Sequence, residues 1–148
     1  MEPIRELLDR SGYEYEWIRH ERPIRSAREG ADYFGIDAGQ TAPTLILSTD
    51  RGYVALTVAG DRGPIDFAEL AERLESSSVC LAPPKEVKRA TGFEAGSVPM
   101  IGHSLPAVVD RRLLHYSAVY GGTGDPLATL KIDPRALLSL NEVLLVID

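Results

Sequence analysis

The most informative stretch of this 148-residue chain is a loop with glycine near both ends and proline between them, Gly96-Ser97-Val98-Pro99-Met100-Ile101-Gly102-His103. Because glycine has no side chain, its backbone can approach a ligand or a neighbouring strand closely and adopt positive φ angles. Main-chain N–H groups in such a loop can stabilise a carbonyl oxygen that gains negative charge during a reaction. The alternative is a tight turn at a sheet edge, and the loop taken alone favours that interpretation.

A second glycine-rich segment, Gly121-Gly122-Thr123-Gly124-Asp125-Pro126, directly follows a predicted strand at 117–120. It is not a dinucleotide-binding fingerprint, because a strand rather than a helix follows it. The same two interpretations apply, a ligand-binding loop or a turn. If the two glycine-rich segments meet in the fold, their main-chain amides would line one compact cleft.

Helical and strand patterns alternate around these segments without repeats or long linkers. Ser26 and Asp66 are predicted helix N-caps, each followed three residues later by Glu. The predicted helices span 3–12, 26–35, 66–74, 84–92 and 133–140. The predicted strands span 13–18, 44–47, 53–58, 79–81, 107–109, 117–120, 127–132 and 143–147. Hairpins mixed with crossovers predict an α/β (α+β) fold with a mixed, partly barrel-like β-sheet flanked by short helices, in a single domain over 1–148.

Two finer predictions concern individual strands. The last strand, 143–147, is apolar throughout and is therefore expected near the centre of a sheet. Cys80 lies between Val79 and Leu81, and we expect it to be buried as a small apolar side chain.

The charge balance limits the kind of partner. The net charge is −6 and the sequence pI is about 5.1, whereas a protein that grips a nucleic-acid backbone needs a basic face. Local basic clusters occur at Lys85, Lys88 and Arg89 and at Arg111 with Arg112, and such clusters are usually solvated surface. Binding to DNA or any extended duplex is not expected, while contact with one nucleotide end stays open.

Other classes of site find no support in the sequence. A single cysteine allows no intramolecular disulfide, and three scattered histidines do not suggest a metal site. We expect no cofactor. No apolar run approaches the roughly 20 residues that cross a bilayer, and the acidic N-terminal segment does not resemble a signal peptide. The expected location is cytoplasmic, with no membrane contact.

In this order, the segments resemble the YbaK/prolyl-tRNA-synthetase-associated family of trans-editing aminoacyl-tRNA deacylases. The similarity runs from His20 to Asp148, and the ordered series is more specific than any one piece. It rests on the helix at 26–35, Gln40-Thr41-Ala42-Pro43-Thr44-Leu45, Val58-Ala59-Gly60-Asp61-Arg62, Thr91-Gly92-Phe93-Glu94, the loop at 96–103, and Gly122 with Gly124.

This resemblance implies a YbaK-like fold and an activity. Members hydrolyse the ester that joins a wrong, small amino acid to tRNA, acting as a second check because one methylene gives only about 1–3 kcal/mol of discrimination. The implied partners are the acceptor end of an aminoacyl-tRNA and an aminoacyl-tRNA synthetase. The ester is already activated, so positioning and main-chain donors can suffice without a metal.

The resemblance also suggests site residues. Catalytic roles are implied for Gly102, Gly122 and Asp61. Substrate contacts are implied for His20, Pro43, Arg62, Gly96, Val98, Pro99, Ile101, His103, Gly121, Thr123 and Gly124. For Asp61 with Arg62, an exposed ion pair in a turn is an equal alternative, and His103 is also explained as a hydrogen-bonding surface histidine.

The sequence departs from the family pattern at one position. The family's functional lysine belongs between Ala42 and Thr44, where this chain has Pro43. Proline supplies no cation and no N–H and fixes its own φ, although it is tolerated at the start of a strand. Either Arg62 or another cation takes over, or catalysis is weak or absent. The competing hypothesis is therefore a non-catalytic binding module for an amino acid or an aminoacyl-tRNA end, and a structural or dimerisation protein is a third.

Overall fold

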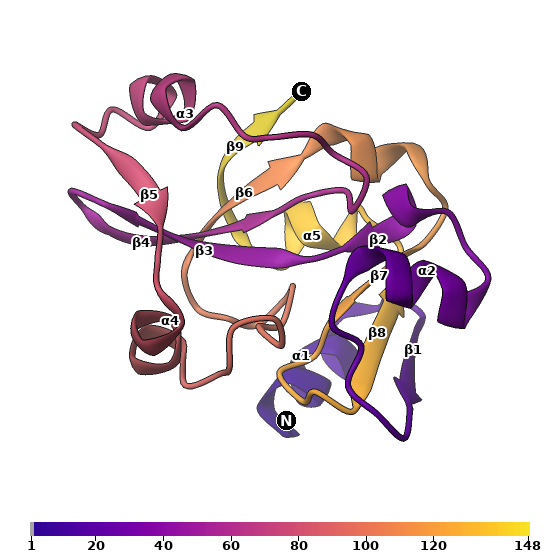
Figure 1. Cartoon of the computed structure of the whole chain (residues 1–148). Helices are drawn as coiled ribbons and strands as arrows, with labels where there is room; N and C mark the ends of the chain where they lie inside the picture. Colours follow the sequence, from indigo (N-terminus) through magenta and orange to yellow (C-terminus); the bar gives the residue numbers. More distant parts are fainter. Residues whose placement is uncertain (1) are drawn as a thin grey trace.

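The computed structural model describes residues 2–148 and contains two mixed β-sheets with short helices around them (Figure 1). The small sheet has the strand order β1 (Tyr15–Arg19), β8 (Ala128–Ile132), β7 (Val119–Gly122) and β2 (Thr41–Ala42). The large sheet has the order β5 (Val79–Leu81), β3 (Thr44–Thr49), β4 (Gly52–Thr57), β6 (Pro106–Asp110) and β9 (Glu142–Ile147). The mixed α+β fold predicted from sequence is confirmed, as two separate sheets rather than a closed barrel.

The helices are short and follow the predicted positions. They are α1 (Glu2–Ser11), α2 (Ala27–Phe34), α3 (Phe67–Arg73), α4 (Pro84–Thr91) and α5 (Ala136–Ser139), with 3₁₀ turns η1 (Ala38–Gln40) and η2 (Arg111–His115). The predicted helix at 133–140 is reduced to the four residues of α5. No helix among residues 2–148 is long and apolar enough to span a membrane.

The start and end of α2 are set by local chemistry. The Ser26 side chain accepts a hydrogen bond from the Glu29 N–H at 3.0 Å, as an N-cap does. Gly35 ends the helix with φ 67°, a left-handed angle that glycine adopts without strain. These caps fix where α2 lies beside the small sheet.

The most direct connection between the two sheets is the step from β2 to β3. β2 belongs to the small sheet and β3 to the large one, and only Pro43 separates them. Proline has no N–H to donate to a sheet ladder, so a point where the chain changes sheets suits it. The Pro43 carbonyl still accepts a hydrogen bond from the Val58 N–H at 3.1 Å.

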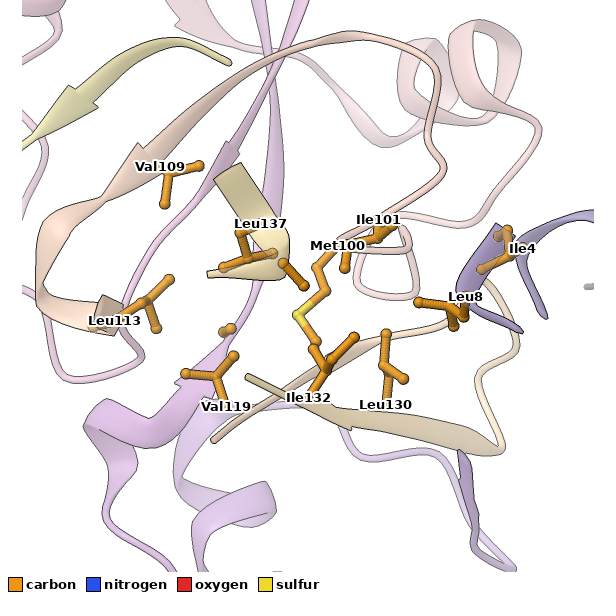
Figure 2. Packing of buried hydrophobic residues seen from close by; sticks show 13 residues of the cluster. Ile4, Leu8, Met100, Ile101, Val109, Leu113, Val119, Leu130, Ile132 and Leu137 are labelled. Atoms are coloured by element: carbon orange, nitrogen blue, oxygen red, sulfur yellow. The ribbon is translucent and has the colours of Figure 1, made fainter. Parts of the chain in front are cut away.

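The main core anchors the apolar half of the loop at 96–103. Figure 2 shows Met100 and Ile101 among the buried side chains of the small sheet, α1 and α5. Both side chains are fully buried. They share one cluster with Leu130, Ile132 and Leu137. The loop is thus held in place by burial of its own apolar side chains.

Two predictions about strands are wrong. β9 is an edge strand and not a central one. Its pairing with β6 jumps from Val143 to Leu145, which leaves Leu144 in a bulge with 52% of its surface exposed. Cys80 is exposed because β5 is the opposite edge of the same sheet. An apolar sequence did not distinguish an edge from a centre here, since neighbouring clusters cover one face of each edge strand.

Candidate functional site

The two glycine-rich segments meet at β7. Gly121 and Gly122 belong to this strand rather than to the turn after it. The Met100 N–H donates to the Gly122 carbonyl at 3.1 Å. A Cβ atom at Gly122 would overlap the main-chain oxygen of Val98, and one at Gly121 would overlap the Met100 sulfur. Both glycines are therefore required for the loop to pack against the strand.

A cavity of about 270 Å³ lies beside this contact, where α2, β2, β7 and β8 come together (Figure 1). Its size is close to the lower end of small-molecule pockets, roughly 300–1,000 Å³. We call it the α2–β7 pocket. Its lining comprises His20, Ile24, Arg25, Ser26, Ala27, Gly30, Phe34, Thr41, Ala42, Pro43, Leu45, Gly96, Ser97, Tyr120, Gly121, Gly122, Asp125, Pro126, Ala128 and Thr129.

Five of the residues suggested by the sequence line this pocket together. They come from four separate parts of the chain: His20, Pro43, Gly96, Gly121 and Gly122. Pro43 lies on the wall, at the position where the family pattern places its lysine. These five residues therefore meet around position 43, and the lining that the structure describes contains no lysine.

Asp61 and Arg62 lie elsewhere and do not pair with each other. The Arg62 guanidinium binds the buried Asp110 carboxylate at 3.1 Å and donates to the Asp148 main-chain oxygen at 2.8 Å. Asp110 also accepts a hydrogen bond from the Ala59 N–H at 3.0 Å. Arg62 is thus committed to a structural ion pair and does not line the α2–β7 pocket.

The Asp61 carboxylate and the Tyr116 hydroxyl both lie beside Gly39, where a Cβ atom would overlap each of them. Partial burial, followed by the nearby Asp61 carboxylate, raises the pKa of Tyr116, since both disfavour a phenolate. Both side chains lie beside η1 and outside the α2–β7 pocket.

Most of the loop at 96–103 serves the core. Val98, Pro99 and Ile101 are buried. Gly102 has φ 91°, and a Cβ atom there would meet the Ile4 side chain at 2.9 Å. Of this loop, only Gly96 and Ser97 line the pocket.

His103 is buried and uncharged. It is 5% exposed, and its Nδ1 accepts a hydrogen bond from the Leu105 N–H at 3.1 Å. Burial lowers the pKa of His103 to about 4, because the imidazolium cannot be solvated there. Nε2 then carries the proton and has no hydrogen-bond partner among residues 2–148.

Thr123 and Gly124 shape the turn between β7 and β8. The Thr123 hydroxyl donates to the Ala128 carbonyl at 3.0 Å and accepts from the Asp125 N–H at 3.0 Å. Gly124 has φ 94°. Neither residue lines the pocket, and both position Asp125, which does.

Sequence reasoning missed the cation of the pocket, Arg25. It belongs to a basic segment in which arginine recurs every three residues, at Arg19, Arg22, Arg25 and Arg28. Arg19 pairs with Asp125 at 3.3 Å. Arg22, Arg25 and Arg28 are exposed and form no ion pair with any residue from 2 to 148. The regular spacing of these arginines is the sequence signal for a basic segment, although the chain as a whole is acidic.

Three of the five residues in the basic clusters named from the sequence have acidic partners. Lys88 lies 3.5 Å from Glu94, and Arg89 lies 3.9 Å from Glu86. Arg111 binds the side chain of Asp148. None of these clusters borders the α2–β7 pocket.

Sequence reasoning also missed a contact between two pocket residues, His20 and Thr129. His20 is 8% exposed. Its Nδ1 lies 2.7 Å from the Arg22 carbonyl oxygen, and its Nε2 lies 3.1 Å from the Thr129 hydroxyl. The main-chain N–H of His20 also donates to the Leu127 carbonyl at 2.9 Å. Ring and backbone are therefore both fixed against β8.

Aromatic rings extend from the pocket to the surface. The ring centres of Phe34 and Tyr120, both in the lining, are 5.0 Å apart. Tyr33 packs edge-on against Phe34 at 4.9 Å and is 57% exposed. An exposed aromatic ring such as that of Tyr33 offers a face on which a nucleobase can stack.

The pocket thus combines an amino-acid-sized cavity, an arginine with no ion-pair partner among residues 2–148, and a histidine held against a hydroxyl. The sequence pattern of the aminoacyl-tRNA editing domain family matches residues 21–140, and the chain belongs to this family.

The most informative relatives are enzymes of prolyl-tRNA synthesis. The chain is 29% identical over 90 residues to the proline–tRNA ligase of Caldicellulosiruptor bescii, covering 61% of this chain and 16% of the ligase. It is 28% identical over 119 residues to that of Thermosipho melanesiensis, covering 79% of this chain and 21% of the ligase. The chain therefore spans about a fifth or less of these relatives.

Two solved structures match over almost their whole length. The hypothetical protein APE2540 superposes with a TM-score of 0.85 at 29% identity, covering 97% of this chain and 96% of that one. A candidate trans-editing enzyme for prolyl-tRNA synthetase superposes with a TM-score of 0.81 at 28% identity, covering 97% and 92%. The YbaK-like fold implied by the sequence is confirmed by these matches.

Proposed function

We propose that residues 1–148 form a single editing domain that removes a small amino acid from mischarged tRNA by hydrolysing the aminoacyl ester. The observation that carries this proposal is the α2–β7 pocket, where both glycine-rich segments and position 43 meet in a cavity of about 270 Å³. That volume suits an aminoacyl group and leaves the rest of the tRNA outside. We place the activity in the cytoplasm, with a synthetase supplying the mischarged tRNA.

We propose that Arg25 supplies the positive charge that Pro43 cannot. Arg62 is engaged by Asp110, whereas Arg25 lines the pocket without an ion-pair partner among residues 2–148. A guanidinium binds phosphate through two parallel N–H groups, so Arg25 suits the phosphate next to the terminal nucleoside. Phe34 lines the same pocket, and Tyr33 packs against it, so these rings are the surfaces on which we place the terminal base.

We assign the ester carbonyl to main-chain groups beside Gly96 and Gly122. Both residues line the pocket, and Gly96 has φ 91°. An N–H group aimed at the carbonyl oxygen stabilises the charge that develops on it. Gly102 and Asp61 lie outside the lining, so this proposal gives them no contact with the substrate.

The test is hydrolysis of tRNA charged with alanine, cysteine or serine. Purified protein is expected to release the amino acid faster than the uncatalysed reaction. Arg25→Ala is expected to raise KM, most strongly at low salt, because phosphate contacts are screened. Lys85→Ala, far from the pocket, is the matched control. If the wild type leaves all three esters intact, the proposal is refuted for these substrates.

A non-catalytic binding module is the second candidate, favoured by Pro43 in place of lysine. It predicts no hydrolysis but a raised Tm with an amino acid or an aminoacyl-adenosine analogue, since a ligand of the folded state stabilises it. Pro43→Lys separates the two cases. Hydrolysis gained by this variant alone would mean a complete site that lacks only its cation.

A further inference from the structure

The α2–β7 pocket contains a hydroxyl and an imidazole in contact, each with a defined hydrogen-bonding role. The Arg22 carbonyl oxygen, 2.7 Å from His20 Nδ1, can only accept. Nδ1 therefore carries a proton, and in the neutral ring Nε2 is left with a lone pair. The group that faces this lone pair is the Thr129 hydroxyl at 3.1 Å, which donates to it. The hydrogen-bond partners of the two ring nitrogens therefore determine that Nδ1 of His20 carries the proton.

We infer that His20 is the general base of the reaction and that Thr129 relays the proton to it. A base held within 2.6–3.2 Å of a hydroxyl, with its other nitrogen oriented by a third group, is the arrangement used to activate nucleophiles. Here a main-chain carbonyl takes the orienting position that a carboxylate often occupies. This inference rests on the proposed function, because it concerns the same ester.

The proton transfers balance without a metal or a covalent intermediate. Thr129 donates to Nε2 and accepts a hydrogen bond from the water that attacks the ester carbonyl carbon. As the new C–O bond forms, the proton of the water passes to Thr129 and that of Thr129 passes to Nε2. When the bond to the ribose oxygen breaks, the proton returns through Thr129 to that oxygen. The products are the free amino acid and the uncharged tRNA end.

The surroundings of His20 favour this role over a purely structural one. Its ring is almost completely buried, yet both it and Thr129 line the cavity. The charged and titratable groups around it are Arg25 and Asp125 in the lining, Arg19 paired with Asp125, the exposed Glu21 next to it in the chain, Arg22 two residues on, and the edge-on ring of Tyr33 at 5.8 Å. Asp125, the acidic residue of the pocket lining, is already paired with Arg19, and Nδ1 is already bonded to the Arg22 carbonyl, so no carboxylate of the lining competes for its proton.

Three variants test the relay on alanyl-, cysteinyl- and seryl-tRNA. His20→Asn keeps an N–H for the Arg22 carbonyl but has no base, and should lower kcat by about 100-fold or more. Thr129→Val keeps the shape without the hydroxyl and should lose a similar factor, whereas Thr129→Ser should stay within a few-fold of wild type. His115→Asn and Thr49→Val, an exposed histidine and a hairpin threonine outside the pocket, should leave kcat unchanged. Tm values establish that each variant folds.

The pH profile separates a base from a structural contact. After subtraction of the uncatalysed rate, wild-type kcat should fall as the pH is lowered, because a protonated imidazole cannot accept the proton of the relay. This limb should vanish in His20→Asn. A wild type that hydrolyses the esters while His20→Asn and Thr129→Val keep its rate and profile would overturn the relay alone. A wild type that hydrolyses none of them overturns the proposed function as well.

Discussion

The buried His103 should make the stability of this protein depend on pH. Burial lowers its pKa to about 4 in the folded protein, against about 6.5 in an unfolded chain. As the pH falls below 6.5 the unfolded state binds the proton first, so folding loses stability between pH 6.5 and 4. Full stability is present above that window. At about 1.4 kcal/mol per pH unit, the loss from this one group is about 2 kcal/mol at pH 5 and about 3 kcal/mol at pH 4.

His103→Asn tests this reasoning, because its side-chain oxygen can still accept from the Leu105 N–H and does not titrate. Urea unfolding at pH 8, 6, 5 and 4 gives the free energy of unfolding for each protein. The difference between wild type and variant should shift by about 2 kcal/mol in favour of the variant from pH 8 to pH 5. Carboxylates titrate in both proteins and cancel. His115→Asn, at an exposed histidine, should show no shift. A pH-independent difference for His103→Asn would refute the buried, neutral state.

Two further changes probe the parts of the fold that hold the site. Asp110→Ala leaves a buried guanidinium and two N–H groups without their carboxylate and should lower the free energy of unfolding in urea by about 3–5 kcal/mol. Asp133→Ala breaks an exposed ion pair and should lower it by less than about 1 kcal/mol. Equal losses in the two variants would contradict the burial argument. Gly122→Ala forces a methyl group against the Val98 oxygen. It should lower the free energy of unfolding by about 1–3 kcal/mol or more and should also abolish hydrolysis. A Cβ atom at Gly63 would meet open space, so the control Gly63→Ala should change the free energy of unfolding by less than about 1 kcal/mol. A tolerated Gly122→Ala would show that the loop does not need this close contact.

Local signals in the sequence predicted most of the fold. Ser26 and Asp66 cap their helices through bonds to residues three positions on, and Gly35 and Gly92 end helices with positive φ. Such features depend on neighbours in the chain, so the sequence displays them directly. The pairing of strands depends on distant partners, which is why β9 was expected at the centre of a sheet and lies at an edge.

The site was predictable in part for the same reason. Glycine spacing indicated both segments that meet at β7. Arg62 stands next to Asp61 in the chain, but its carboxylate partner is Asp110, 48 residues away. The partner of His20 is Thr129, 109 residues away. Contacts across such separations arise only when distant strands pair within a sheet, as β1 does with β8 and β4 with β6, and no spacing rule reveals them.

The crossing at Pro43 has a mechanical consequence. The walls of the pocket belong to both sheets, with Leu45 on one side and Tyr120 and Thr129 on the other, and the chain passes between them at a single residue. A molecule lodged in the cavity would therefore clamp the two sheets together beside this crossing. Slower hydrogen exchange of the main-chain amides along β2 and β3 would show this clamping even for a ligand whose ester is not hydrolysed.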